Sequence, residues 1–426
     1  MGLLYNIGII LYFVITLPYY LYKMAFARKY RAGLFQRLGF ISRPAREELS
    51  GRRVIWIHAV SVGEVQAAMP LIKELRARLP DRSVLLSTTT MTGNAIAVEK
   101  AGGMATVIYF PLDFPWAVSR ALRAFKPEVV AIVETEIWPN FLKAARRQGV
   151  PVVIVNGRIS DRSFGGYLKL RPILRGILEC IDVFCMQTGA DAERVERIGA
   201  PRDRIRVTGN MKYEASLGTS PGKEQVCGEI GLDAGRDYIV AGSTHSGEEE
   251  ILIRVYERLR GRFKGLSLIV VPRHPERSRE VLNIARAAGI SSCLRSELSS
   301  RQEPPDVVVV DTIGELMSLY AVADVVFVGK SLAGHGGQNV IEPASLGKAV
   351  LFGPHMENFK QASGLLLEAG GAAMVQGEEE LEKRLGELLS DDGARTAMGE
   401  RARKVVECNR GATAGNVALI EEMLKK

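Results

Sequence analysis

Polar side chains that can do chemistry gather where short runs of β-branched residues end. Residues 58–64 follow the first such run, residues 134–140 follow a later one, and residues 272–277 follow a third in the second half of the chain. These segments carry carboxylates, histidines and arginines, which proteins use for proton transfer and for binding anions. Because ligands of open α/β sheets bind at the carboxyl ends of the strands, we expect these segments to form a substrate site.

The histidines do not predict a metal centre. All five lie at or just after predicted strand ends, and one histidine in such a place is more often structural than functional. No two of them have the spacing of a metal-binding pair such as H-x₃-H, and no Asp-x-Asp pair is present to hold an ion against a diphosphate. We therefore expect a reaction without a metal or other cofactor. The five are His58, His245, His274, His335 and His355.

Two familiar nucleotide-binding motifs are excluded. Residues 329–331 end like a phosphate-binding P-loop, but Asp324 stands where the first glycine of that motif is required. No G-x-G-x-x-G follows the first predicted strand, which argues against a dinucleotide-dependent oxidoreductase.

The elements that must position these residues alternate between strands and helices. Runs such as Val54–His58 and Val129–Val133 alternate with helical segments such as Glu64–Arg78 and Pro115–Phe125. This alternation is typical of parallel sheets covered by helices. The other predicted strands are Ser83–Thr88, Val107–Tyr109, Val152–Val155, Val183–Met186, Arg206–Val207, Tyr238–Ala241, Leu266–Val271, Val307–Val310, Val325–Val328 and Ala349–Phe352.

The length of 426 residues and a break in the pattern indicate two α/β domains in series. We expect a first Rossmann-like domain over residues 23–216, a polar linker over 217–223 and a second Rossmann-like domain over 224–426. The final helix, about Asn416–Lys425, can pack on either domain.

Charge and cysteine content narrow the class of protein. The 56 basic and 48 acidic residues give a net charge of +8, which suits an anionic membrane surface or a phosphorylated substrate. The excess is spread along the chain, so we expect no nucleic-acid partner. The five cysteines are odd in number and form no C-x-x-C pair, which favours a reducing compartment over a disulfide framework.

Residues 1–22 are expected to form a membrane anchor. They contain no charged side chain, and about 20 apolar residues span the hydrocarbon core of a bilayer. Lys23, Arg28, Lys29, Arg31 and Arg37 follow, with no acidic residue before Glu47, which predicts a cytoplasmic location for the rest of the chain. Asn6 and Pro18 interrupt the apolar run, so whether the segment crosses the bilayer or lies in its plane stays open.

Six motifs in order give the chain a resemblance that covers nearly its whole length, from the anchor to about residue 375. It resembles the family of 3-deoxy-D-manno-octulosonic acid (Kdo) transferases of lipopolysaccharide synthesis. The motifs lie at residues 61–64, 134–140, 209–212, 272–277, 311–316 and 336–343. Many members of the family carry histidine where this chain has Gln338, so any contact made there through an imidazole would need an amide instead.

The resemblance implies a GT-B architecture, with the active site in the cleft between the two Rossmann-like domains. It also implies an inverting transfer of Kdo from CMP-Kdo to a hydroxyl of the lipid A precursor (lipid IVA). The partners are then CMP-Kdo, that precursor and lipids of the inner membrane, at its cytoplasmic face.

The same resemblance assigns catalytic roles within the first domain. Glu64 is expected to be the general base, while Glu134 and Lys212 support the transition state. From the residues alone, an ordinary first-turn glutamate stabilised by the helix dipole is the favoured interpretation of Glu64. Glu134 and Lys212 read equally as a salt bridge without a catalytic share.

The donor is expected to bind the second domain, and the acceptor the first. Arg273 offers a planar fork for phosphate or cytosine, and the positions near two helix starts offer free backbone N–H groups. Arg158 and Arg162 are candidates for contacting acceptor phosphates, although a solvated basic face is the commoner explanation for such charges. The proposed donor-binding residues are Pro272, Arg273, Ile313, Gly314, Glu315, Asn339 and Glu342.

Two other functions compete with this interpretation. One is a GT-B protein that uses a UDP-sugar, either as a transferase or as a sugar-nucleotide epimerase; binding of CMP rather than UDP distinguishes them. The other is a membrane-tethered nucleotide-binding protein without turnover, which an activity assay of wild type and Glu64→Ala distinguishes.

Overall fold

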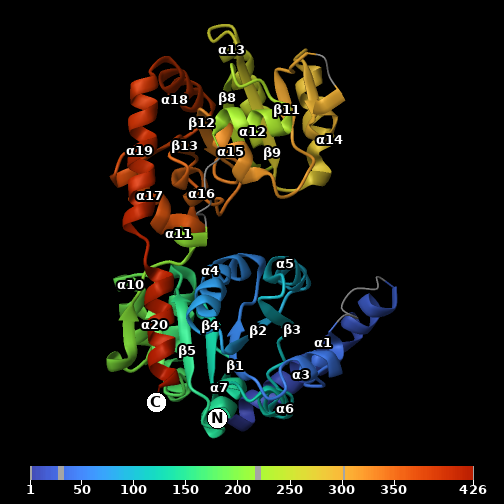
Figure 1. Cartoon of the computed structure of the whole chain (residues 1–426), viewed down its shortest axis with the longest axis vertical. Coiled ribbons are helices and arrows are strands. Elements are labelled where there is room, and N and C mark those ends of the chain that lie inside the picture. The colour runs from blue at the N-terminus through green and yellow to red at the C-terminus, as the bar shows by residue number, and fades with distance from the viewer. Residues whose placement is uncertain (1, 27–32, 216–221, 301–302, 426) are drawn as a thin grey trace. The chain divides into compact units, whose positions relative to one another are not determined.

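The computed structural model describes residues 2–26, 33–215, 222–300 and 303–425 (Figure 1). The chain forms two compact units. Unit 1 comprises residues 1–215 together with residues 410–426, and unit 2 comprises residues 216–409. Each unit contains one parallel sheet with helices on its faces.

The sheet of unit 1 has seven parallel strands in the order β3-β2-β1-β4-β5-β6-β7. Alternate side chains point to opposite faces, so Trp56 of β1 joins one apolar core while Ile55 and Ile57 join the other. Burial on both faces accounts for the continuous apolar runs of these strands. Their bounds are β1 Arg53–His58, β2 Arg82–Thr88, β3 Ala105–Tyr109, β4 Val129–Val133, β5 Val152–Gly157, β6 Val183–Met186 and β7 Ile205–Val207.

Helices cover both faces of this sheet. One face packs against α4, α5 and α20 through Val65, Ala97 and Val417, and the other packs against α6, α7, α9 and α10. The helices of unit 1 are α1 Gly2–Phe26, α2 Leu34–Arg37, α3 Arg43–Glu48, α4 Val62–Arg78, α5 Met91–Ala101, α6 Pro115–Phe125, α7 Pro139–Arg147, α8 Asp161–Lys169, α9 Arg171–Leu178, α10 Gly189–Ile198, η1 Arg202–Arg204, α11 Lys212–Ala215 and α20 Ala412–Leu424.

The C-terminal helix α20, whose domain the sequence leaves open, packs in unit 1. Its Val417 and Ile420 are fully buried beside α4, β4 and β5. The start of α20 is held by Glu214, whose carboxylate accepts hydrogen bonds from the backbone N–H of Thr413 (2.9 Å) and from the Thr413 hydroxyl. A carboxylate at a helix N-terminus satisfies N–H groups that have no partner within the helix.

Unit 2 repeats the arrangement with the strand order β10-β11-β9-β8-β12-β13-β14. Its strands are β8 Asp237–Thr244, β9 Leu266–Pro272, β10 Ser292–Leu294, β11 Val307–Val309, β12 Val325–Val328, β13 Ala349–Phe352 and β14 Ala372–Met374. Its helices are α12 Lys223–Ile230, α13 Glu248–Arg260, η2 Pro275–Arg277, α14 Ser278–Ala287, η3 Arg295–Ser300, α15 Leu316–Val322, α16 Ile341–Ser345, η4 Glu357–Phe359, α17 Lys360–Glu368, α18 Glu378–Ser390 and α19 Asp392–Cys408.

The structure differs from the sequence predictions at a few boundaries. Strand β5 extends through Asn156 and Gly157, and β8 extends through Thr244, so these polar residues belong to strands and not to the loops after them. The three-residue edge strands β10 and β14 are absent from the prediction. Lys223, placed in the linker, opens α12, while residues 217–221 of that linker lie outside the described residues.

Helix α1 contacts the rest of unit 1 through polar side chains near its start. The Tyr5 hydroxyl donates to Asp113 Oδ2 (2.8 Å), and Asn140 Nδ2 donates to Asn6 Oδ1 (2.7 Å). Phe13 packs edge-on against Phe114, with ring centroids 5.4 Å apart. Within the part of the chain that the structure describes, no helix combines the length and apolar character needed to cross a membrane.

Asp113 links α1 to the start of α7. Its buried carboxylate accepts from the backbone N–H groups of Asn140 (3.0 Å) and Phe141 (2.8 Å) as well as from Tyr5. Burial raises the pKa of Asp113 and these hydrogen bonds lower it; burial is the larger effect, and the resulting pKa is about 6. Asp113 therefore caps α7 from a distant part of the sequence and fixes α1 at the same time.

We expect Asp113→Ala to destabilise the protein more than Tyr5→Phe. The first change leaves two buried N–H groups without an acceptor, at about 1–3 kcal/mol each, whereas the second removes one hydrogen bond worth about 1 kcal/mol. Urea unfolding of both variants measures the difference, with the exposed Asp81→Ala as control. Equal stability of Asp113→Ala and wild type would contradict the capping role.

Candidate active site

Two of the three predicted catalytic residues, Glu64 and Glu134, lie where the strand order of unit 1 reverses direction. From β1 the chain proceeds outward to β2 and β3, then returns to β4 on the other side of β1. The loops after β1 and β4 therefore diverge at the carboxyl edge, which is where open α/β sheets bind ligands. Glu64 follows β1 and Glu134 follows β4.

Glu64 lies in the first turn of α4, where it is only 7% exposed. Ser61 is the N-cap residue of this helix. The two carboxylate oxygens of Glu64 accept hydrogen bonds from the backbone N–H of Val60 (2.7 Å) and from the Ser61 hydroxyl (2.8 Å). A carboxylate offers about four acceptor positions, so these two bonds orient Glu64 and leave capacity for another proton donor.

The surroundings of Glu64 hold its pKa near neutrality. Burial is the main cause, since it disfavours the charged form, and the negative charge of Glu134 adds to it. Together they raise the pKa of Glu64 to about 7, against the opposing effect of the hydrogen bonds from Val60 and Ser61. A base with this pKa can accept a proton at physiological pH and release it afterwards.

Glu134 adopts a left-handed backbone conformation, with φ of 60°. This region is unfavourable for a residue with a side chain and is found preferentially at functional sites. The Glu134 N–H is held by the Val155 carbonyl of the neighbouring strand (2.9 Å). Its side chain forms an ion pair with Lys212, whose Nζ lies 3.0 Å from Oε1, and both side chains are about one-quarter exposed or less.

Asn156 positions the segment that carries Lys212. It is fully buried at the end of β5, again with a positive φ (56°), and its side-chain oxygen accepts from the Met211 N–H (3.0 Å). Met211 and Tyr213, on either side of Lys212, are buried. The backbone is thus anchored on both sides of Lys212, while the ammonium group reaches Glu134.

Glu136 is a third carboxylate of this site, and the sequence analysis gives it no role. Burial raises its pKa, and the charge of Glu134 raises it further. The pKa of Tyr167 is raised by burial and then by the charge of Glu136. The Glu-x-Glu spacing after β4 was a usable signal, because two carboxylates so close along the chain influence each other's protonation.

His58 is a buried residue of the core of unit 1. It is fully buried, its ring stacks on Phe110 at 3.7 Å between centroids, and its Nδ1 lies 3.0 Å from the Ser87 hydroxyl. Burial lowers the pKa of His58 to about 3. It is therefore neutral at physiological pH and packs as part of the core.

The predicted acceptor-binding arginines differ in their surroundings. Arg158 is partly buried, and its backbone N–H donates to Thr135 Oγ1 (3.0 Å), which ties it to the Glu134 loop. Arg162 is exposed in the first turn of α8. Arg37 donates to the Thr89 carbonyl (2.6 Å) and lies over the Tyr109 ring. Arg28, Lys29 and Arg31 lie outside the described residues.

In unit 2 the strand order reverses between β8 and β12. Pro272 ends β9, and the exposed Arg273 follows it, with its backbone N–H bound to the Thr244 carbonyl at the end of β8 (3.0 Å). Residues 313–315 come directly before α15, and Ile313 is 86% exposed. These residues therefore lie at the carboxyl edge of this sheet, as predicted.

The remaining donor-site candidates are held by local hydrogen bonds. The carboxylate of Glu315 binds Arg295 (2.9 Å) and accepts from the Thr312 hydroxyl. Asn339 Oδ1 accepts from the Ile341 N–H (3.0 Å), which orders the start of α16, and Glu342 lies in the first turn of that helix.

Glu248 is a residue of this edge that the sequence analysis missed. It is fully buried at the start of α13, and its two oxygens accept from four backbone N–H groups at 2.7–3.0 Å. Three of these belong to residues 330–332, so Glu248 ties the loop after β12 to the loop after β8. A glutamate in a first helical turn is too common for its sequence position alone to reveal this role.

Comparison with known proteins gives this geometry a family. The family of 3-deoxy-D-manno-octulosonic-acid transferases (kdotransferases) matches residues 32–215. A 3-deoxy-D-manno-octulosonic acid transferase of Haemophilus influenzae is 32% identical over 93% of this chain and 93% of its own length. Another from Bordetella pertussis is 36% identical over 89% and 91%. The chain belongs to the Kdo transferase family. As a Kdo transferase it is a glycosyltransferase, as the sequence resemblance implies.

Solved structures support the architecture of this Kdo transferase. A UDP-GlcNAc 2-epimerase from Neisseria meningitidis, bound to UDP-GlcNAc, covers 88% of this chain and 100% of its own, with a TM-score of 0.58 at 15% identity. Acinetobacter baumannii MurG covers 87% and 99%, with a TM-score of 0.52 at 14% identity. At such identities the likeness shows the fold alone, which is that of two Rossmann-like domains as in GT-B proteins.

We expect Glu134→Gln to lower the pKa of Glu64. The substitution removes the negative charge that opposes ionisation of Glu64 and releases Lys212 from its ion pair, and both changes favour the carboxylate. A ¹³C NMR titration of the Glu64 carboxyl group measures a midpoint near 7 in wild type and a lower one in the variant. Glu74→Gln, on the same helix, is the control. A wild-type midpoint near 4.5, the ordinary glutamate value, would contradict the description of the site.

Proposed function

We propose that the protein is an inverting transferase that moves Kdo from CMP-Kdo to a hydroxyl of the lipid A precursor, lipid IVA, in lipopolysaccharide synthesis. Membership of the Kdo transferase family supports the transferred sugar. The observation that carries the mechanism is the burial of Glu64 at the carboxyl edge of unit 1, with a pKa of about 7.

Glu64 is the general base in this proposal. The hydroxyl oxygen of the acceptor attacks the anomeric carbon of Kdo, and the proton of that hydroxyl passes to Glu64. The bond between the anomeric carbon and the phosphate oxygen of CMP breaks, and its electron pair leaves with CMP. A single displacement of this kind inverts the configuration at the anomeric carbon. The phosphate is a good leaving group, so the site needs a base more than it needs a strong acid.

Glu134 and Lys212 act together in the transition state. Their ion pair fixes the Lys212 ammonium near the carboxylates of the site, where it offsets negative charge as CMP departs. Glu134 has a second effect, because its charge raises the pKa of Glu64 and so makes that base stronger. We propose that the chemical step needs no metal, since the fixed ammonium group supplies the positive charge.

Unit 2 carries the proposed donor site. The exposed guanidinium of Arg273 suits the phosphate or the cytosine, and Glu342 suits the ribose hydroxyls. Residues 313–315 offer backbone N–H groups to a base edge. Unit 1 carries Arg158 and Arg162, which suit the phosphates of the acceptor.

We propose that α1 holds the protein at the cytoplasmic face of the inner membrane. Tyr5, Asn6 and Phe13 face unit 1, while Leu11 and Ile15 are exposed. Apolar residues on the free side of such a helix can enter the interfacial layer of a bilayer without crossing it. In this proposal the predicted anchor over residues 1–22 binds the membrane surface without crossing the bilayer.

We expect Glu64→Gln to reduce kcat by about 100-fold or more, the usual contribution of a general base. Wild-type kcat should rise with pH up to about 7 and level off above it, because the ionised form of Glu64 is the active one. Both are measured with CMP-Kdo, lipid IVA and a chelator, by mass spectrometry of the lipid. Full activity of Glu64→Gln would sink the assignment, and a loss of kcat with the chelator at saturating CMP-Kdo would sink metal independence of the chemical step. Glu74→Gln serves as the control.

CMP is expected to stabilise the protein against heat, whereas UDP is not. A ligand at one hundred times its Kd stabilises the folded state by about 2.7 kcal/mol. Thermal unfolding with each nucleotide measures this, and Arg273→Ala and Glu342→Gln should reduce the effect of CMP, while the exposed Arg279→Ala should not. Stabilisation by UDP alone would favour a UDP-sugar enzyme instead.

A further inference from the structure

Two loops at the carboxyl edge of unit 2 are joined by their backbones. Residues 329–340 follow β12, and residues 353–359 follow the neighbouring strand β13. The His355 N–H donates to the Ser331 carbonyl (3.0 Å), and the Asn358 N–H donates to the Gly336 carbonyl (2.9 Å). The first loop needs glycine here, since Gly336 and Gly337 have φ of 111° and 67°.

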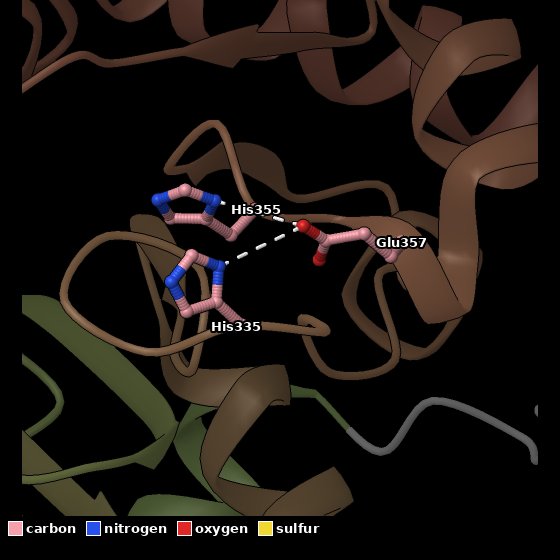
Figure 2. A group of neighbouring side chains, drawn as sticks. All are labelled: His335, His355 and Glu357. Atoms are coloured by element: carbon pink, nitrogen blue, oxygen red, sulfur yellow. Dashed lines mark ion pairs between the residues drawn. The ribbon is translucent and has the colours of Figure 1, made fainter.

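Three potential metal ligands converge where these loops meet. His335 Nδ1 and His355 Nδ1 lie 3.8 Å and 3.6 Å from the same oxygen, Oε1 of Glu357 (Figure 2). The two imidazole rings are 4.0 Å apart between centroids. One donor atom from each of the three residues lies within 4.8 Å of the others.

The carboxylate of Glu357 is already oriented toward the imidazoles. Its other oxygen, Oε2, accepts from the Gly336 N–H (2.7 Å), which leaves Oε1 directed at the two histidines (Figure 2). Hydrogen bonds of this kind fix ligand geometry in metal sites.

We propose that His335, His355 and Glu357 form a binding site for a divalent transition metal, with Zn²⁺ the best fit. Two imidazoles and one carboxylate form a ligand set that zinc accepts, with water in the fourth position. Bonds of about 2.0–2.2 Å in a tetrahedron place neighbouring ligand atoms about 3.3–3.6 Å apart. The two imidazole–carboxylate separations of 3.8 Å and 3.6 Å are close to this value, whereas the two imidazole nitrogens, which lie within 4.8 Å of each other, have to move closer as the metal binds. Imidazole ligands disfavour Mg²⁺ and Ca²⁺, which prefer oxygen.

The bound ion would cross-link the two loops. His335 lies in the glycine-rich loop, whereas His355 and Glu357 follow β13, so one metal joins segments that are otherwise held by hydrogen bonds. The first loop continues directly into Asn339 and Glu342, two of the proposed donor-binding residues. The inference that the metal stiffens a donor-binding loop rests on the proposed function, whereas the inference that the site binds a metal does not.

The test is a Zn²⁺ titration of the full-length, tag-free protein in a Cys408→Ser background. That substitution removes the exposed thiol of Cys408, because thiolates bind zinc and a free one would add a second binding site. After the protein is stripped with a chelator, competition with a chromophoric chelator should show one Zn²⁺ per chain. Co²⁺ should give the visible absorption of a tetrahedral site.

We expect His335→Ala, His355→Ala and Glu357→Gln each to weaken Zn²⁺ binding by at least about tenfold. His274→Ala is a matched control, because His274 is an exposed histidine with one carboxylate, Glu276, at 3.8 Å. The side chains of His335 and Glu357 are 77% and 58% exposed. Without metal, the variants of these two residues should therefore unfold at the same temperature as the metal-free Cys408→Ser protein. Absence of stoichiometric binding, or equal affinity in wild type and all three variants, would overturn the proposal. Neither outcome depends on donor, acceptor or transfer activity.

Discussion

Buried or partly buried carboxylates that must find hydrogen-bond donors set much of the local geometry of this protein. Leaving a buried charge without partners is costly, and at the positions described the partners are mainly backbone N–H groups. Asp113 fixes the start of α7, Glu214 fixes the start of α20, and Glu248 gathers the loop after β12. Glu64 differs because it accepts only two hydrogen bonds, so acceptor positions stay available. The same requirement thus produces rigid joints in three places and a reactive group in the fourth.

Much of the fold could be predicted because parallel strands buried on both faces are written as continuous apolar runs. Strand β4 begins and ends as predicted for this reason. The edge strands β10 and β14 have three residues each, too short for such a signal. The placement of α20 could not be predicted either, because it depends on Glu214, a residue far away in sequence.

The candidate site was predictable to the extent that chemistry follows strand ends. Glu64, Glu134 and Arg273 lie at the carboxyl edges where they were expected. The proposed role of Glu64 rests on the family resemblance, because a first-turn glutamate has an ordinary explanation. Asn156 positions the Lys212 segment through a hydrogen bond to Met211, and its backbone has a positive φ; the pattern of residues in the sequence predicts neither feature. His335 and His355 meet only because β12 and β13 are neighbours, so their spacing in the sequence conceals them.

The position of α20 also bears on how the chain is made. Unit 1 contains both the first half of the sequence and residues 410–425, so unit 2 is an insertion within it. During synthesis on the ribosome, unit 2 has all of its residues before unit 1 does. Until α20 emerges, the partners of Val417 and Ile420 on β4, β5 and α4 remain uncovered. The half of the protein that carries the proposed base therefore completes its core last, although most of its residues are translated first.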